Sequence, residues 1–221
     1  MEHRKLSSQS GFTLVEIAIV LVIIGLLLGG VLKGQEIIDN ARIKNAAADM
    51  NGVSAAFNSY VDRFRRLPGD DGPLATLTAR GGPWASVTAG GNNNGVVAVT
   101  AAQVFTGGGE GVAFWQSLKA AGFIAGNVAD IGVAALPRNA FNGLTGVGIG
   151  VTPAAGAAAI SVCISQVPGK AARALDTQFD DGVPNRGAVL ATLGAVGVNT
   201  APGAAAATYS DDQQYTVCRT L

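Results

Sequence analysis

The sequence predicts an α+β fold in which one long N-terminal helix precedes a globular domain built on a small antiparallel sheet. Three observations support this prediction. A charge-free apolar run is followed by apolar residues at helical spacing, and the rest of the chain holds short alternating segments between Gly-rich turns. We therefore divide the chain into a short N-terminal segment (1–11), a long helix (12–66, apolar over 12–32) and a globular domain (67–221).

Composition excludes several classes of protein. The 221 residues carry 15 Lys+Arg and 15 Asp+Glu, so the formal net charge is zero. A nucleic-acid-binding protein usually has a basic surplus, and we therefore expect no nucleic-acid partner. With one His and two Cys, a single subunit cannot build a His/Cys zinc cluster, and no His accompanies either Cys in the globular domain. We expect a protein that is not an enzyme.

The apolar segment 12–32 has 21 residues, close to the roughly 20 that a membrane-spanning helix requires. The basic residues before it, Arg4 and Lys5, predict that the N-terminus stays in the cytoplasm and that the later residues are exported. The alternative is a cleaved secretory signal. That alternative is disfavoured because the apolar run is longer than usual and no small-residue cleavage site follows Leu32.

Glu16 is the one charge inside this segment, and an ionisable side chain there marks a functional site by default. It needs a cationic partner, which its own apolar helix cannot supply. Two sources remain: another subunit, or a free amino group made by cutting the chain nearby. A cut after Gly11 would create an ammonium group at Phe12, four residues from Glu16.

The string Gly11-Phe12-Thr13-Leu14-Val15-Glu16, followed by the long apolar run, resembles the cleavage and methylation signature of type IV prepilins and pseudopilins. The resemblance implies that Met1–Gly11 is a leader peptide. A prepilin peptidase would cut between Gly11 and Phe12 and would methylate the new amino group of Phe12. It also implies that Glu16 pairs with the N-terminal amine of a neighbouring subunit during filament assembly.

The resemblance implies a structural role with three variants: major pilin, minor pilin, or pseudopilin of a type II secretion system. The precursor would cross the inner membrane once, and its globular domain would be periplasmic, or extracellular in the filament (a pilus, or fimbrium). Its partners would be the prepilin peptidase, the membrane and other pilin-like subunits in a homo- or hetero-oligomeric filament. The alternative from a different class is a membrane-tethered exported binding or adhesion module that does not polymerise.

Beyond Leu32 the pattern predicts that the helix continues as an amphipathic one. Apolar residues recur mostly every three or four positions. They are Ile37, Ile38, Ala41, Ala46, Met50, Val53, Phe57, Tyr60 or Val61, and Phe64. The Pro- and Gly-rich segment 67–73 ends the pattern, so we expect a helix from Phe12 to about Arg65 with the globular domain on its apolar face.

Residues 74–221 read as short elements separated by Gly-rich loops. We expect Trp84 and Trp115 in the core. The expected elements are a helix over 110–122, a strand over 157–165, a short helix over 169–179, strands over 188–192 and 215–219, and a surface loop over 200–208.

Cys163 and Cys218 fall in two of the expected strands. In an exported domain the oxidising compartment makes a disulfide the default, and the resemblance agrees because pilins often have such a C-terminal loop. The alternative is a pair of buried, inert thiols.

Asp176, Asp180 and Asp181 lie close together in the sequence, and clustered carboxylates can bind calcium. Some pseudopilins bind calcium in their C-terminal region. The spacing does not match an EF-hand loop, and Asp-Asp-Gly-x-Pro also fits a helix cap and turn. We expect no other cofactor.

Overall fold

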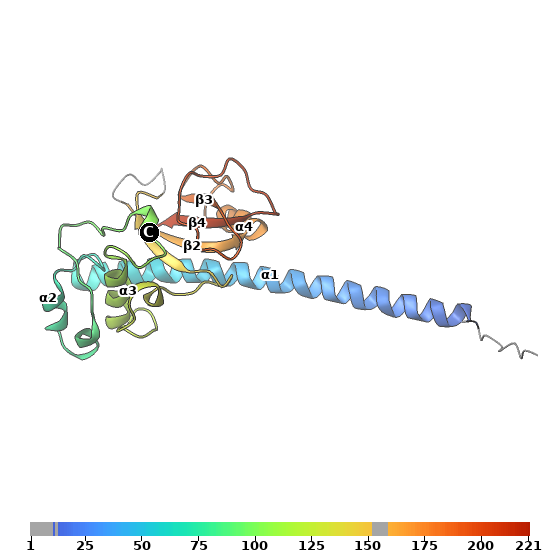
Figure 1. The fold of residues 1–221 in the computed structure, drawn as a ribbon, viewed down its shortest axis with the longest axis horizontal. Coiled ribbons are helices and arrows are strands. Elements are labelled where there is room, and N and C mark those ends of the chain that lie inside the picture. Colours follow the sequence, from blue (N-terminus) through green and yellow to red (C-terminus); the bar gives the residue numbers. More distant parts are fainter. Residues whose placement is uncertain (1–10, 12, 152–158) are drawn as a thin grey trace, which may run out of the picture. The chain divides into compact units, whose positions relative to one another are not determined.

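The structure is a computed structural model that describes residues 11, 13–151 and 159–221 (Figure 1). The chain divides into two compact units, Met1–Ala41 and Arg42–Leu221, each described here by itself. The helices are α1 (Leu14–Phe64), α2 (Leu74–Thr78), α3 (Gly111–Ala120) and α4 (Gly169–Phe179), with three 3-10 turns at Gly82–Ser86, Ala101–Gln103 and Gly132–Ala135. The strands are β1 (Thr145–Ile149), β2 (Ile160–Pro168), β3 (Val189–Gly194) and β4 (Gln214–Thr220).

The long N-terminal helix is confirmed, and α1 has 51 residues. In the second unit one face of α1 enters the core at intervals of mostly three or four residues, as the helical period requires. The buried residues of α1 are Ala46, Ala47, Met50, Val53, Ala56 and Tyr60. The prediction that Ile37, Ile38 and Ala41 share this buried face was wrong: all three are exposed, and they belong to the first unit.

The end of α1 is fixed by a buried carboxylate. The hydroxyl of Tyr60 donates to Asp71 Oδ2 over 2.5 Å, and the guanidinium of Arg80 donates to the same oxygen over 2.7 Å. Tyr60 and Asp71 are both buried. Arg80 also lies over two aromatic rings that contact each other, with its guanidinium carbon 4.6 Å from the ring centroid of Trp84 and 5.0 Å from that of Phe64. The segment after the helix is thereby held against its last turns.

The sheet has the order β1-β2-β4-β3, and all neighbours are antiparallel. The expected strands over 188–192 and 215–219 are β3 and β4, and β2 covers most of the expected strand over 157–165, of which 157 and 158 lie outside the described residues. β1 was not expected from the sequence, because its glycines interrupt the alternating pattern. A Cβ atom at Gly146 would lie 2.1 Å from the carbonyl oxygen of Val104, so this strand needs glycine there to pack closely.

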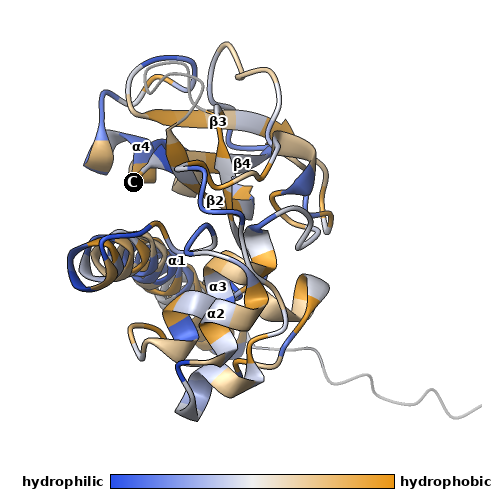
Figure 2. Cartoon of the chain, turned by 90° about the vertical axis from the view of Figure 1, so that its left-hand side faces the viewer, coloured by the Kyte–Doolittle hydropathy of each residue, from blue (hydrophilic) through white to orange (hydrophobic). Residues whose placement is uncertain are grey.

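Helix α3 is enclosed on all sides, since each of its ten residues is buried. The helix expected over 110–122 is confirmed as α3, and Trp115 lies in the core as expected, together with Phe114 and Leu118. Trp84 is also in the core, as expected. Figure 2 shows α2 and α3 on one side of the second unit and the sheet with α4 on the other. The short helix expected over 169–179 has the observed bounds of α4.

The Tyr60–Asp71 contact gives a stability prediction. Replacing Tyr60 by Phe removes one donor from a buried carboxylate, so we expect the free energy of unfolding to fall by about 1–3 kcal/mol. Chemical denaturation of the full chain in detergent, followed by near-ultraviolet circular dichroism, measures this change. In an Asp71→Asn background the same substitution should cost much less, since the charge it serves is gone. An equal cost in both backgrounds would contradict the assignment.

Candidate processing and assembly site

Three reciprocal hydrogen bonds between Thr13 and Glu16 cap the N-terminus of α1. The backbone N–H and the hydroxyl of Thr13 each donate to Glu16 Oε2 over 2.8 Å. In return, the backbone N–H of Glu16 donates to Thr13 Oγ1 over 3.3 Å. This is a capping box, in which a Thr and a Glu three residues apart satisfy otherwise unpaired N–H groups at a helix start.

Thr13 was not among the functional residues predicted from the sequence. The Thr13-x-x-Glu16 spacing was the signal that could have found it. The structure adds two hydrogen bonds from Thr13 to the Glu16 carboxylate, and the cationic partner expected for Glu16 stays a prediction. Both bonds end on Oε2, and among the described residues no side chain or backbone group bonds to Oε1. Within the described residues, Oε1 is therefore the oxygen of Glu16 that is open to a cation.

Of the two residues predicted to flank the cleaved bond, Gly11 is exposed and precedes the helix. Phe12, with its predicted N-methylation, and residues 1–10 of the predicted leader lie outside the described residues. The cut after Gly11 and the methylation of Phe12 therefore remain predictions.

The apolar part of α1 is solvent-exposed along its length in the isolated chain. Leu14 is 90% exposed and Leu26 is 73% exposed, and no residue of the most apolar stretch of α1 is buried. By length and composition this helix could cross a membrane. A surface of this size and apolarity needs lipid or other protein around it, because water is an unfavourable environment for it.

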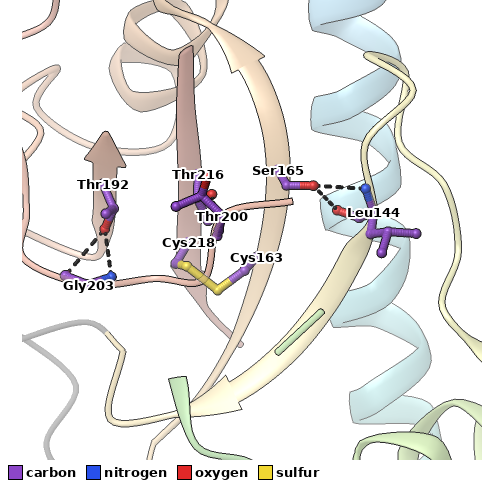
Figure 3. Close-up of a disulfide and its surroundings, with 8 residues drawn as sticks. All are labelled: Leu144, Cys163, Ser165, Thr192, Thr200, Gly203, Thr216 and Cys218. Carbon is purple, nitrogen blue, oxygen red and sulfur yellow. Dashed lines mark hydrogen bonds between the residues drawn. A yellow bond between two sulfur atoms is a disulfide. The ribbon is translucent and has the colours of Figure 1, made fainter. Parts of the chain in front are cut away.

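The disulfide between Cys163 and Cys218 is present, and the prediction is confirmed (Figure 3). The two residues face each other in the register of β2 and β4, and both are buried. The alternative of two inert thiols was wrong. Nearby, the hydroxyl of Thr216 donates to the carbonyl oxygen of Thr200 over 2.6 Å, which holds the connection between β3 and β4 against the sheet.

The three candidate calcium ligands come together, since Asp176, Asp180 and Asp181 have oxygens within 4.8 Å of one another. Each carboxylate also accepts hydrogen bonds from the chain. Asp176 accepts from the Tyr209 hydroxyl over 2.7 Å, and burial raises the pKa of Asp176. Asp180 accepts from the backbone of 188 and 189, and Asp181 from that of 183. These oxygens could hold a calcium ion, but their present bonds are those of a helix end and turn.

We expect calcium to leave the thermal stability of the chain unchanged, because these carboxylates already have hydrogen-bonding partners. Melting curves of the full chain in detergent, with calcium, with magnesium and with chelator, measure this. A rise in melting temperature that is specific to calcium and is lost in Asp181→Asn would contradict the expectation and establish the metal site.

Comparison with known proteins agrees with the geometry of the N-terminus. Residues 6–32 match the family described as "Prokaryotic N-terminal methylation motif". No match to a curated protein was found. The matched range contains Gly11, Phe12, Thr13 and Glu16, and it ends where the charge-free run ends. The N-terminal segment of this chain therefore carries the signature of a type IV prepilin-like precursor.

Proposed function

We propose that this chain is a structural subunit of a type IV pilus or of a type II secretion pseudopilus. The precursor is inserted in the inner membrane, cleaved after Gly11, N-methylated at Phe12 and assembled into a helical filament. The match of residues 6–32 to the methylation motif carries this proposal, because the matched range includes the exposed apolar start of α1. The role is structural, and the proposal includes no catalytic activity.

The presence of Glu16 in the apolar segment supports filament assembly, and not only membrane anchoring, as the role of α1. A lone carboxylate in an apolar environment is costly, and a pair of opposite charges is tolerated there only when both partners are present. Cleavage creates an ammonium group at Phe12, and the free Oε1 of Glu16 on a neighbouring subunit can accept from it. Thr13 holds Oε2 of the same carboxylate at 2.8 Å, so the group is oriented before the neighbour arrives.

Moving the apolar part of α1 from lipid into a bundle of like helices exchanges one apolar environment for another. The hydrophobic effect therefore supplies little of the driving force, and close packing and the buried ion pair must hold the subunits. Extraction from the membrane then needs work from another protein, since the sequence contains no Gly-Lys-Ser/Thr phosphate-binding loop. The resemblance assigns this work to a cytoplasmic assembly ATPase.

Mass spectrometry of the N-terminus tests the processing steps. The protein is taken from two fractions of native cells, the sheared surface material and the membranes. We expect a mature chain that begins with N-methylated Phe12. Its presence in the shear fraction would indicate an external pilus, and its confinement to membranes would indicate a secretion pseudopilus. An uncut chain, or a cut beyond Leu32, would overturn the proposal.

Substitution of Glu16 tests assembly. We expect Glu16→Ala to reduce filament yield about tenfold or more while membrane insertion is retained, because the Phe12 ammonium would lose its buried partner. Glu36→Ala is the matched control, since Glu36 lies on the same helix but forms an exposed ion pair with Lys33. In a tethered module that never polymerises, neither substitution would change the amount or the location of the protein. Equal behaviour of the two variants would therefore favour that alternative.

A further inference from the structure

A polar pocket lies in the second unit, at the C-terminal end of β2. Its lining residues are all distant in sequence from the predicted processing site. Its volume is about 250 Å³. The residues that line it include Arg42, Phe141, Asn142, Gln166, Pro168 and Gln214. The lining has one ionisable side chain, the guanidinium of Arg42, and three amides. Nothing in the proposed filament role uses these side chains.

The fold places two of the amides by means of unusual backbone conformations. The pairing of β2 with β4 shifts register between Ile164 and Val167, and Gln166 in this bulge has a φ of 59°. Asn142, in the turn before β1, has a φ of 66°. A bulge redirects a side chain that would otherwise follow the alternation of the strand. Left-handed backbone is costly for Gln, which makes Gln166 a position of functional interest.

The polar groups of this pocket are short of partners. Among the described residues, no hydrogen bond or ion pair engages the side chains of Arg42, Asn142 or Gln214, and Gln214 Oε1 is buried. Gln166 makes one hydrogen bond, from its Nε2 to Asn199 Oδ1 over 3.0 Å. Buried polar atoms are normally paired, and Gln214 Oε1 is one of two in the described part of the chain that are not. The donors and acceptors open to a ligand are those of the exposed Arg42 and Asn142, whereas Gln214 Oε1 is enclosed by the protein.

The chemistry of the lining selects the ligand. A single guanidinium without a second cation suits one carboxylate rather than a doubly charged phosphate. Amide side chains present a donor and an acceptor together, which matches neighbouring hydroxyl groups that can act as both. Phe141 and Pro168 add apolar surface for a C–H face. The volume is below the range for drug-sized ligands and suits one sugar ring.

From these observations we propose that this pocket binds an acidic monosaccharide unit, such as a hexuronate in a surface glycan. The carboxylate pairs with Arg42, the ring hydroxyls bond to the amide of Asn142, and one ring face lies against Phe141. This binding is independent of polymerisation, so it does not rest on the proposed filament role.

Saturation-transfer NMR on the full chain in detergent tests the proposal, with galacturonate as the probe and glucose and acetate as comparisons. We expect saturation of the sugar ring protons and tighter binding of galacturonate than of either comparison. Acetate binding as tightly as galacturonate would overturn the proposal, because only a carboxylate would then be recognised. Tighter binding of an Asp-Gly dipeptide would overturn it in favour of an acidic peptide.

Variants locate the binding. Arg42→Gln should weaken galacturonate binding about tenfold or more, because it removes a charge-assisted hydrogen bond. Asn142→Gly should also weaken binding, and it preserves the fold because glycine accepts the left-handed backbone of this position. Lys44→Gln is the control, since Lys44 is an exposed cation of the same helix outside the pocket. An equal loss of galacturonate affinity in Lys44→Gln and Arg42→Gln would show that the sugar responds only to the overall positive charge of the helix. That result would overturn the proposed site.

Discussion

The buried carboxylate of Asp71 is the interaction on which the second unit depends. It joins Tyr60, the last fully buried residue of α1, to Arg80 in the segment that follows α2. Arg80 in turn lies against Trp84 and Phe64. Asp71 is only 5% exposed, and a buried charge is tolerated only when it has such partners. Loss of any one of these contacts would therefore destabilise the whole cluster. The last turns of α1 are thereby part of the globular core.

Two further buried carboxylates organise the loops next to this junction. Asp70 accepts from the backbone N–H groups of Asn94 and Gly95, and Glu110 accepts from those of Asn92 and Ala98. Burial raises the pKa of Glu110, with the charge of Asp70 adding to the effect. A Gly- and Asn-rich segment without regular secondary structure thus obtains a defined conformation from two acidic side chains.

The sequence predicted the elements whose signals are local. The bounds of α4 followed from Pro168 before the helix and the Asp-Asp-Gly turn after it, and the helical period located α1. β1 could not be predicted, because its glycines serve close packing against Val104 rather than alternation. The contacts of Asp70, Asp71 and Glu110 could not be predicted either, since their partners lie 9 to 25 positions away in the sequence. At the N-terminus, the motif indicated Gly11, Phe12 and Glu16, but the role of Thr13 needed the geometry of the helix start.

The start of α1 has a consequence for the chemistry of maturation. The helix begins at Leu14 and its capping residue is Thr13, so Gly11 precedes the helical hydrogen bonds that the described residues form. The proposed cut after Gly11 would leave the hydrogen bonds between Thr13 and Glu16 intact, so the precursor and mature chains would share this helix start. The helix could remain in the bilayer, unchanged in length, while its leader is removed.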